Sequence, residues 1–89
     1  KEVMMSKVTI YTKAYCPYCV RAKHVLDSKG VGYHEIRIAA QPELRPEMIA
    51  LAGGKSTVPQ IFVGSRHIGG CDDMLSLDAN GQLDPLLNL

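Results

Sequence analysis

Two cysteines separated by two residues, Cys16 and Cys19, stand where a strand pattern gives way to a helix pattern. Residues 8–12, shortly before them, are all β-branched or aromatic, which predicts a strand. Pro17 suits the first turn of a helix, and the apolar residues after it recur at helical spacing. A strand, a C-x-x-C and a helix in close succession predict a β-α-β unit with both thiols at the carboxyl end of its first strand.

The rest of the chain predicts a small α/β domain. Gly30 is expected to end the first helix. The further predicted elements are a strand at 31–38, a helix from Pro42 or Pro46 to Gly53-Gly54, strands at 61–63 and 66–68 around a Gly64-Ser65 turn, a helix from 71 to about 80, and a last helix at 85–88 capped by Asp84. The order is β-α-β-α-β-β-α, and a right-handed crossover makes the first two strands parallel. We therefore expect a four-stranded mixed sheet flanked by helices.

Length and composition describe one ordinary globular domain. The chain has 89 residues, and its 46% apolar and 21% charged residues are typical of globular rather than disordered proteins. We expect the domain at 7–89, with 1–6 as an N-terminal extension or cloning remnant. A net charge of +1 without a Lys/Arg cluster argues against nucleic-acid or anionic-membrane partners. No secretory signal or bilayer-spanning segment is visible, so we expect a cytoplasmic protein. We also expect it to be a monomer.

Small secreted domains held together by disulfides have a larger and even number of cysteines, whereas this chain has three. A thiol at a helix N-terminus meets unpaired backbone N–H groups and the positive end of the helix dipole, which favour the reactive thiolate. The neighbouring Lys13 adds to this effect. Cys19 follows one turn along the helix, where it can attack a mixed disulfide formed at Cys16. We therefore predict Cys16 as the nucleophile and Cys19 as the buried resolving thiol.

Two other interpretations of the pair remain open on these grounds. A structural zinc site needs about four ligands, and only His67 and Cys71 could complete one. The pair could also be inert core cysteines. The third cysteine, Cys71, is expected to be a small apolar filler or a slow, exposed thiol.

Four segments, taken together, resemble the successive signature segments of the glutaredoxins. They are Tyr11-Thr12-Lys13, Cys16-Pro17-Tyr18-Cys19, Thr57-Val58-Pro59-Gln60-Ile61-Phe62 and Gly69-Gly70-Cys71-Asp72-Asp73. The similarity runs from about Lys7 to Leu87 and is closest to the small bacterial dithiol type called glutaredoxin 3. It implies a thioredoxin-like fold and a glutathione-dependent dithiol–disulfide oxidoreductase that reduces protein disulfides and protein–glutathione mixed disulfides. Glutathione is then a co-substrate, with no tightly bound cofactor and no metal.

The resemblance also implies a glutathione site with two backbone components. Thr57, Val58 and Pro59 would form a cis-proline loop, in which the Val58 backbone pairs with the cysteinyl part of glutathione. Gly70 precedes a helix whose first N–H groups, those of Cys71 and Asp72, would bind the γ-glutamyl carboxylate.

Side chains implied for the same site complement the charges of the tripeptide. Asp72 would receive the ammonium group, with Asp73 as a supporting or capping acid. Lys13 is expected to bind the glycyl carboxylate in preference to Arg45, and Tyr18 to line the groove.

Two rival functions share the expected fold. One is an iron–sulfur cluster carrier, but such members of the family mostly have Gly or Ser where Pro17 stands here. The other is a protein that a thioredoxin-reductase-type enzyme reduces in place of glutathione. Lys13 and the carboxylate site expected at 70–73 argue for glutathione instead.

Overall fold

The computed structural model describes residues 8–89 as one continuous α/β fold. Its elements are β1 (Val8–Thr12), α1 (Pro17–Ser28), β2 (Tyr33–Arg37), the 3-10 helix η1 (Pro42–Leu44), α2 (Arg45–Leu51), β3 (Gln60–Val63), β4 (Arg66–Gly69), α3 (Cys71–Ala79) and α4 (Leu83–Leu86). The expected extension at 1–6 and the expected domain start at residue 7 lie outside the described residues. None of the helices between residues 8 and 89 combines the length and the hydrophobicity that a membrane span requires.

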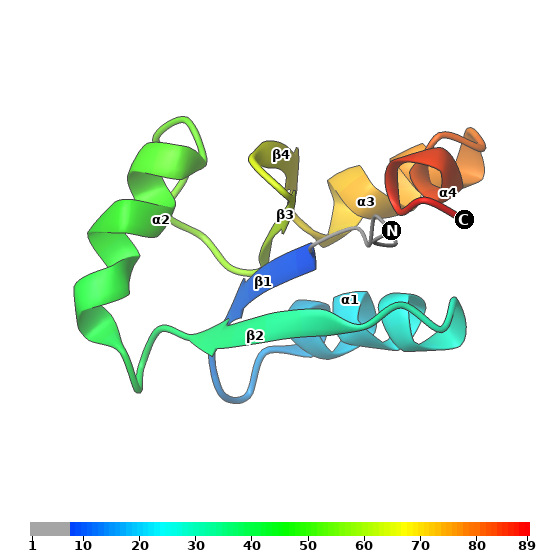
Figure 1. Ribbon diagram of the computed structural model, residues 1–89. Helices are drawn as coiled ribbons and strands as arrows, with labels where there is room; N and C mark the ends of the chain where they lie inside the picture. The colour runs from blue at the N-terminus through cyan, green and yellow to red at the C-terminus, as the bar shows by residue number, and fades with distance from the viewer. Residues whose placement is uncertain (1–7) are drawn as a thin grey trace, which may run out of the picture.

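The four strands form one mixed sheet in the order β2-β1-β3-β4 (Figure 1). β1 pairs in parallel with β2, with Val8 opposite Tyr33, and antiparallel with β3, with Val8 opposite Val63. β3 and β4 form the predicted hairpin, whose turn contains Gly64 at φ +61°. This arrangement confirms the expected α/β class and the thioredoxin-like fold.

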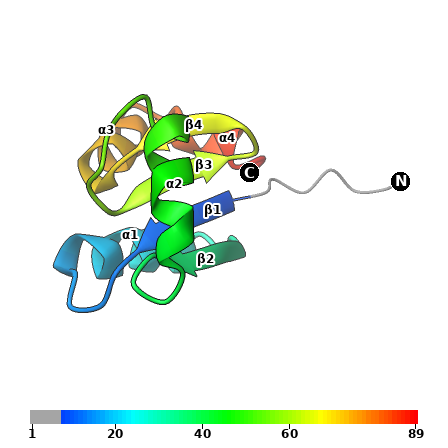
Figure 2. The ribbon, with the colours of Figure 1, turned by 90° about the vertical axis from the view of Figure 1, so that its left-hand side faces the viewer.

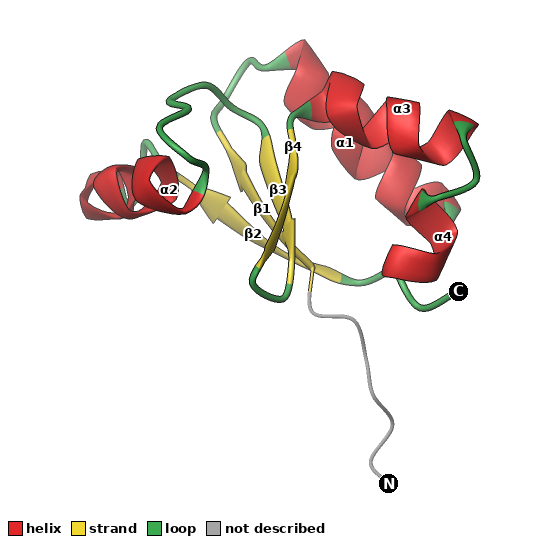
Figure 3. Cartoon of the chain, turned by 90° about the horizontal axis from the view of Figure 1, so that it is seen from above, coloured by secondary structure: helices red, strands yellow, loops and turns green. Residues whose placement is uncertain are grey.

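Helices cover both faces of the sheet. Seen from above, α2 lies alone on one face, while α1, α3 and α4 form a layer on the other (Figure 3). From the side, α2 crosses in front of the strands (Figure 2). The sheet therefore has two apolar faces, each with its own helical cover, as expected for an α/β sheet that contains a parallel pair.

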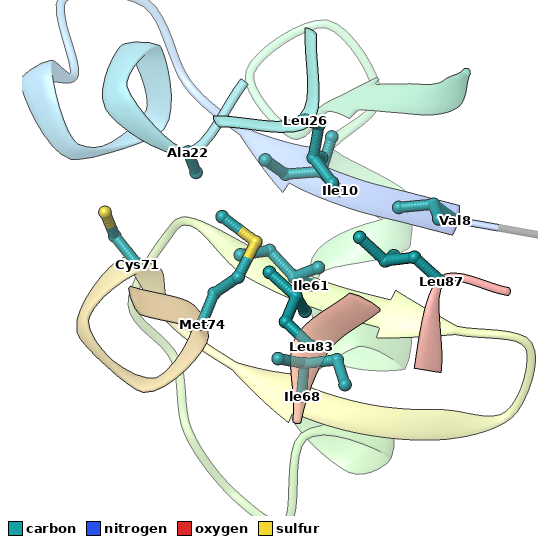
Figure 4. Close-up of a cluster of buried hydrophobic side chains, with 10 residues drawn as sticks. All are labelled: Val8, Ile10, Ala22, Leu26, Ile61, Ile68, Cys71, Met74, Leu83 and Leu87. Atoms are coloured by element: carbon teal, nitrogen blue, oxygen red, sulfur yellow. The ribbon is translucent and has the colours of Figure 1, made fainter. Parts of the chain in front are cut away.

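The larger core fills the layer between the sheet and the three helices. Buried side chains from β1, α1, β3, β4, α3 and α4 meet there, and Met74, Leu26 and Ile10 are fully enclosed (Figure 4). A second cluster under α2 contains Tyr11, Ile36, Ile38, Met48, Ala52 and Phe62. Alternate residues of β1 and β3 face opposite clusters, so both strands are buried on both sides.

Several element boundaries differ from the prediction, most of them by one or two residues. β2 is shorter than the expected strand at 31–38. Both candidate helix starts are used, because Pro42 begins η1 and Pro46 occupies the first turn of α2. The prediction that Asp84 caps a last helix at 85–88 was wrong, since α4 begins at Leu83 with Gln82 at its N-cap. Leu83 is buried in the main core, which draws the first turn of the helix inward.

Candidate active site

The C-x-x-C lies at the N-terminus of α1, as the sequence predicts. Cys16 is the N-cap residue, in an extended conformation, and Pro17 follows at the first helical position. The Cys19 backbone N–H donates to Cys16 Sγ at 3.2 Å. Cys16 therefore occupies a position normally held by Ser or Asp, where its sulfur satisfies a free helix N–H and faces the positive end of the dipole.

Cys16 and Cys19 are joined in a disulfide, with their Cα atoms 5.2 Å apart. The exposed fraction of Cys16 is 6%, and that of Cys19 is only 1%. On either side of Cys16, the side chains of Tyr15 and Tyr18 are exposed. Cys16 is thus the outer sulfur and Cys19 the inner one, which is the order that the predicted roles require.

The loop before β3 approaches the disulfide from the side. The Val58–Pro59 peptide bond is cis, as the resemblance implies. The Val58 carbonyl oxygen lies 3.9 Å from Cys16 Sγ. The backbone of Val58 therefore runs alongside the outer sulfur.

A cleft of about 340 Å³ opens beside this loop. Its lining residues are Tyr18, Lys55, Thr57, Val58, Pro59, Gln60, Gly70, Cys71, Asp72 and Asp73. Every residue predicted for the glutathione site except Lys13 is therefore in one place. Lys13 is exposed in the loop between β1 and α1. The other candidate cation, Arg45, donates a hydrogen bond to the Ser56 carbonyl at 2.8 Å.

The N-terminus of α3 forms one wall of the cleft. The Gly70 N–H donates to Asp73 Oδ2 at 3.0 Å, so Asp73 caps the helix. The side chain of Asp72 is exposed. This confirms the capping role expected of Asp73 and leaves Asp72 as the first-turn acid open to solvent.

Cys71 is a core residue, in agreement with the filler interpretation. Its side chain is 3% exposed and packs with Ala22 and Met74 between α3 and α1 (Figure 4). Burial raises the pKa of its thiol, and the charge of Asp72 acts in the same direction against the opposing effect of Arg21. Cys71 therefore contributes backbone to the cleft and apolar volume to the core.

The extra ligands that a zinc site would need are engaged elsewhere. His67 pairs with Gln60 at 2.6 Å, and Cys71 lies in the core. Across residues 8–89, the structure brings together no group of three or more His, Cys, Asp or Glu side chains that could hold a metal ion.

Two lining residues, Lys55 and Gln60, were missed by the sequence analysis. Lys55 stands two residues before Thr57, and a cation so close to the loop was the available signal. Gln60 begins β3, where a polar residue ahead of an apolar run was the only indication that it has a separate role. The cleft thus carries one unpredicted cation together with the two predicted carboxylates of Asp72 and Asp73.

Comparison with known proteins gives the same picture from sequence and from structure. The glutaredoxin family model matches residues 8–68. Glutaredoxin 3 of Escherichia coli K12 is 57% identical over 83 residues, covering 93% of this chain and 99% of that protein. The solution structure of glutaredoxin from Brucella melitensis is 50% identical with a TM-score of 0.83, covering 98% of this chain and 94% of that one.

A buckwheat glutaredoxin–glutathione complex is also similar. It is 31% identical with a TM-score of 0.84, covering 93% of this chain and 77% of that one. The family model matches well over half of the chain, and the pair that this fold places at the tip of α1 forms a disulfide. The chain therefore belongs to the glutaredoxin family, and it is a dithiol thiol–disulfide oxidoreductase whose disulfide-forming pair is Cys16 and Cys19.

Proposed function

We propose that this protein uses glutathione to reduce protein–glutathione mixed disulfides and protein disulfides, with Cys16 as nucleophile and Cys19 as resolving thiol. The observation that carries the proposal is the position of Cys16 Sγ. It lies at the N-terminus of α1, 3.2 Å from the Cys19 N–H and 3.9 Å from the Val58 carbonyl oxygen. A thiolate there is stabilised by the helix, and it lies beside Val58, which lines the cleft.

On a glutathionylated protein, the Cys16 thiolate attacks the glutathione sulfur. A bond forms between Cys16 Sγ and that sulfur, the original disulfide bond breaks, and the protein thiolate leaves and takes up a proton. A second glutathione, as its thiolate, then attacks the glutathione sulfur bound to Cys16. Oxidised glutathione leaves, and the Cys16 thiolate is regenerated.

On a protein disulfide, Cys16 first forms a mixed disulfide with one protein sulfur and releases the other as a thiol. The Cys19 thiolate then attacks Cys16 Sγ and releases the second protein thiol. The Cys16–Cys19 disulfide that results is the state described here. Two glutathione molecules return it to the dithiol, so that two electrons pass to each substrate disulfide.

Glutathione is proposed to lie along the cleft in an extended conformation. Its cysteinyl part pairs with the backbone of Val58, next to Thr57 and Pro59. Its γ-glutamyl carboxylate meets the N-terminus of α3 at Gly70, Cys71 and Asp72, with the ammonium at the Asp72 side chain and Asp73 holding the helix end.

The glycyl carboxylate is proposed to meet a cation at the other end of the cleft. Lys55 lines the cleft directly, and Lys13 lies in the loop just before the pair. Tyr18 covers the side of the groove, with its ring exposed. Arg45 is held by the Ser56 carbonyl and supports the loop before Thr57.

The working form is proposed to be a cytoplasmic monomer whose functional domain spans 7–89. Reaction with two glutathione molecules requires a compartment that keeps glutathione reduced, which the cytoplasm provides. The redox chemistry requires only Cys16, Cys19 and glutathione, so no tightly bound cofactor is needed. The proposed partners are glutathione and proteins that carry disulfides or bound glutathione.

Matched serine variants of the two cysteines test the assignment. We expect Cys16→Ser to abolish reduction of a glutathionylated peptide, because the nucleophile is lost. Cys19→Ser should retain this activity and lose reduction of a protein disulfide, which needs the resolving thiol. Both reactions are followed by coupling oxidised glutathione to NADPH consumption through glutathione reductase. Equal loss in the two variants would contradict the assigned roles.

A further inference from the structure

Gln60 is a buried amide among apolar side chains. It is 1% exposed, and it lies at the start of β3 opposite Tyr11, on the face of the sheet that α2 covers. Burying an amide costs free energy unless its donors and acceptor find partners. A glutamine in this place is therefore expected to hold specific neighbours together.

Its hydrogen bonds fix the orientation of the amide. Gln60 Nε2 donates to the Thr57 carbonyl oxygen at 3.0 Å and approaches Thr57 Oγ1 at 3.3 Å. Since a carbonyl oxygen only accepts, Nε2 must face Thr57, and Oε1 must face the other way. There Oε1 lies 2.6 Å from His67 Nε2, which is therefore the donor.

His67 is itself held in place. Its ring lies against Phe62, with ring centroids 4.9 Å apart. The chain of contacts thus runs from β4 through a buried amide to the backbone just before the cis peptide bond. One end is anchored on the hairpin and the other on the loop that lines the cleft.

The loop is also confined from the opposite side. A Cβ placed on Gly70 would lie 3.4 Å from the Pro59 carbonyl oxygen, so α3 and the loop are in close approach. Gln60 holds Thr57 on one side, and Gly70 limits Pro59 on the other. Val58 lies between them, with its carbonyl 3.9 Å from Cys16 Sγ.

We propose that Gln60 is a positioning residue, whose side chain sets the place of Thr57 and through it the Val58 backbone that receives the cysteinyl part of glutathione. This inference rests on the proposed glutathione function. The hydrogen bonds of the Gln60 side chain go to Thr57 and His67 and not to the reacting sulfurs. Its effect is on the binding of the substrate rather than on the exchange step.

Two variants separate the Thr57 contacts from the His67 contact. Gln60→Glu keeps the length of the side chain and an acceptor for His67, but as a carboxylate it has no donor for the Thr57 carbonyl. Gln60→Met removes both contacts and adds no charge, so a change shared by the two variants is not due to charge repulsion. We expect the KM for a glutathionylated peptide to rise roughly three- to tenfold in both. The kcat and the rate at which iodoacetamide alkylates reduced Cys16 should stay unchanged.

Ile61→Val is the matched control. It removes buried volume from the adjacent residue on the opposite face of β3 and destabilises the sheet without touching Thr57. Its KM should equal that of the unmodified protein. A Gln60→Glu protein with unchanged KM, or a loss confined to kcat, would overturn the inference. A failure of the unmodified protein to reduce the glutathionylated peptide would instead overturn the proposed function.

Discussion

Cys16 combines two roles that are usually separate, because the proposed nucleophile is also the N-cap of α1. Its sulfur accepts a hydrogen bond from the Cys19 N–H. Pro17 has no backbone N–H, so the first turn of α1 has one unpaired donor fewer. The sequence pattern predicted this, since a proline directly after a cysteine at a strand–helix boundary allows few other placements. Reactivity and helix initiation thus depend on the same atom.

Asp72 is the residue whose charge should matter most for binding and least for folding. Its side chain lines the cleft at the N-terminus of α3 and is exposed. We expect Asp72→Asn to raise the KM for a glutathionylated peptide about two- to fivefold, because one exposed ion pair with the ammonium is lost. Steady-state kinetics at constant ionic strength measure this.

The control for Asp72 is Glu43→Gln, which removes one exposed negative charge from η1, outside the cleft. This variant should keep the KM of the unmodified protein. If both variants raise KM equally, net charge rather than the proposed contact is responsible.

Residue-level prediction succeeded where a local rule applies and failed where folding alone creates the contact. Asp73 was predicted to cap a helix because acids in a first turn do so generally. Gln60 has no such rule, since its partner His67 comes within reach only when β3 pairs with β4. The same holds for Lys55, which reaches the cleft only through the path of the loop before β3.

At the scale of elements, the junction between β4 and α3 leaves no room for a side chain at Gly69. Gly69 has φ +118°, and a Cβ there would collide with the Asp73 carboxyl that caps Gly70. We expect Gly69→Ala to lower the free energy of unfolding by about 2–3 kcal/mol, through backbone strain and loss of the cap. Urea unfolding followed by circular dichroism gives this value.

Gly81 offers the matched comparison, because it also has a positive φ, +72°, but an added Cβ would meet open space. Gly81→Ala should cost only about 1 kcal/mol, the strain of a left-handed alanine. Equal losses at the two glycines would mean that the collision with Asp73 has no energetic consequence.

The order of the elements was predictable from hydrophobic periodicity, and their ends were less so. Gly30 ends α1 as expected, with φ +71° and its N–H bonded to the Asp27 carbonyl. The start of α4 was misplaced because Asp84-Pro85 satisfies the local capping rule, whereas burial of Leu83 decides the outcome. Tertiary packing outweighs a cap of about 1 kcal/mol in such a case.

Across the whole molecule, one lysine ties together the three helices that cover the main core. Lys29, at the end of α1, lies 2.8 Å from Asp78 of α3 and 2.7 Å from Asp84 of α4. The hydrogen bonds that the Lys29 ammonium donates to these two carboxylates raise its pKa. The ion pairs therefore stabilise the fold fully below the ordinary lysine pKa and lose this effect as pH rises through the raised value.

We expect Lys29→Met to lower the Tm at neutral pH and low salt, because the three helices lose their common cation. The difference from the unmodified protein should shrink in about 1 M NaCl, which screens exposed charges. Thermal unfolding at the two salt concentrations tests this, with Arg66→Met, an exposed cation on β4, as the control. A Tm difference that salt does not change would assign the effect to packing of the aliphatic stem.

The burial of Cys71 has a consequence for how the protein stores oxidising equivalents. Cys71 is 3% exposed and packs between α1 and α3, apart from the Cys16–Cys19 disulfide, and Cys16, at 6%, is the most exposed of the three cysteines in the folded state. When Cys16 is oxidised, Cys19 is then the cysteine with which it forms an internal disulfide. Packing of Cys71 in the core, rather than its distance along the chain, prevents a wrong pairing. The folded domain is a carrier with two states, one pair of electrons apart, and unfolding is the route by which a third sulfur would join the exchange.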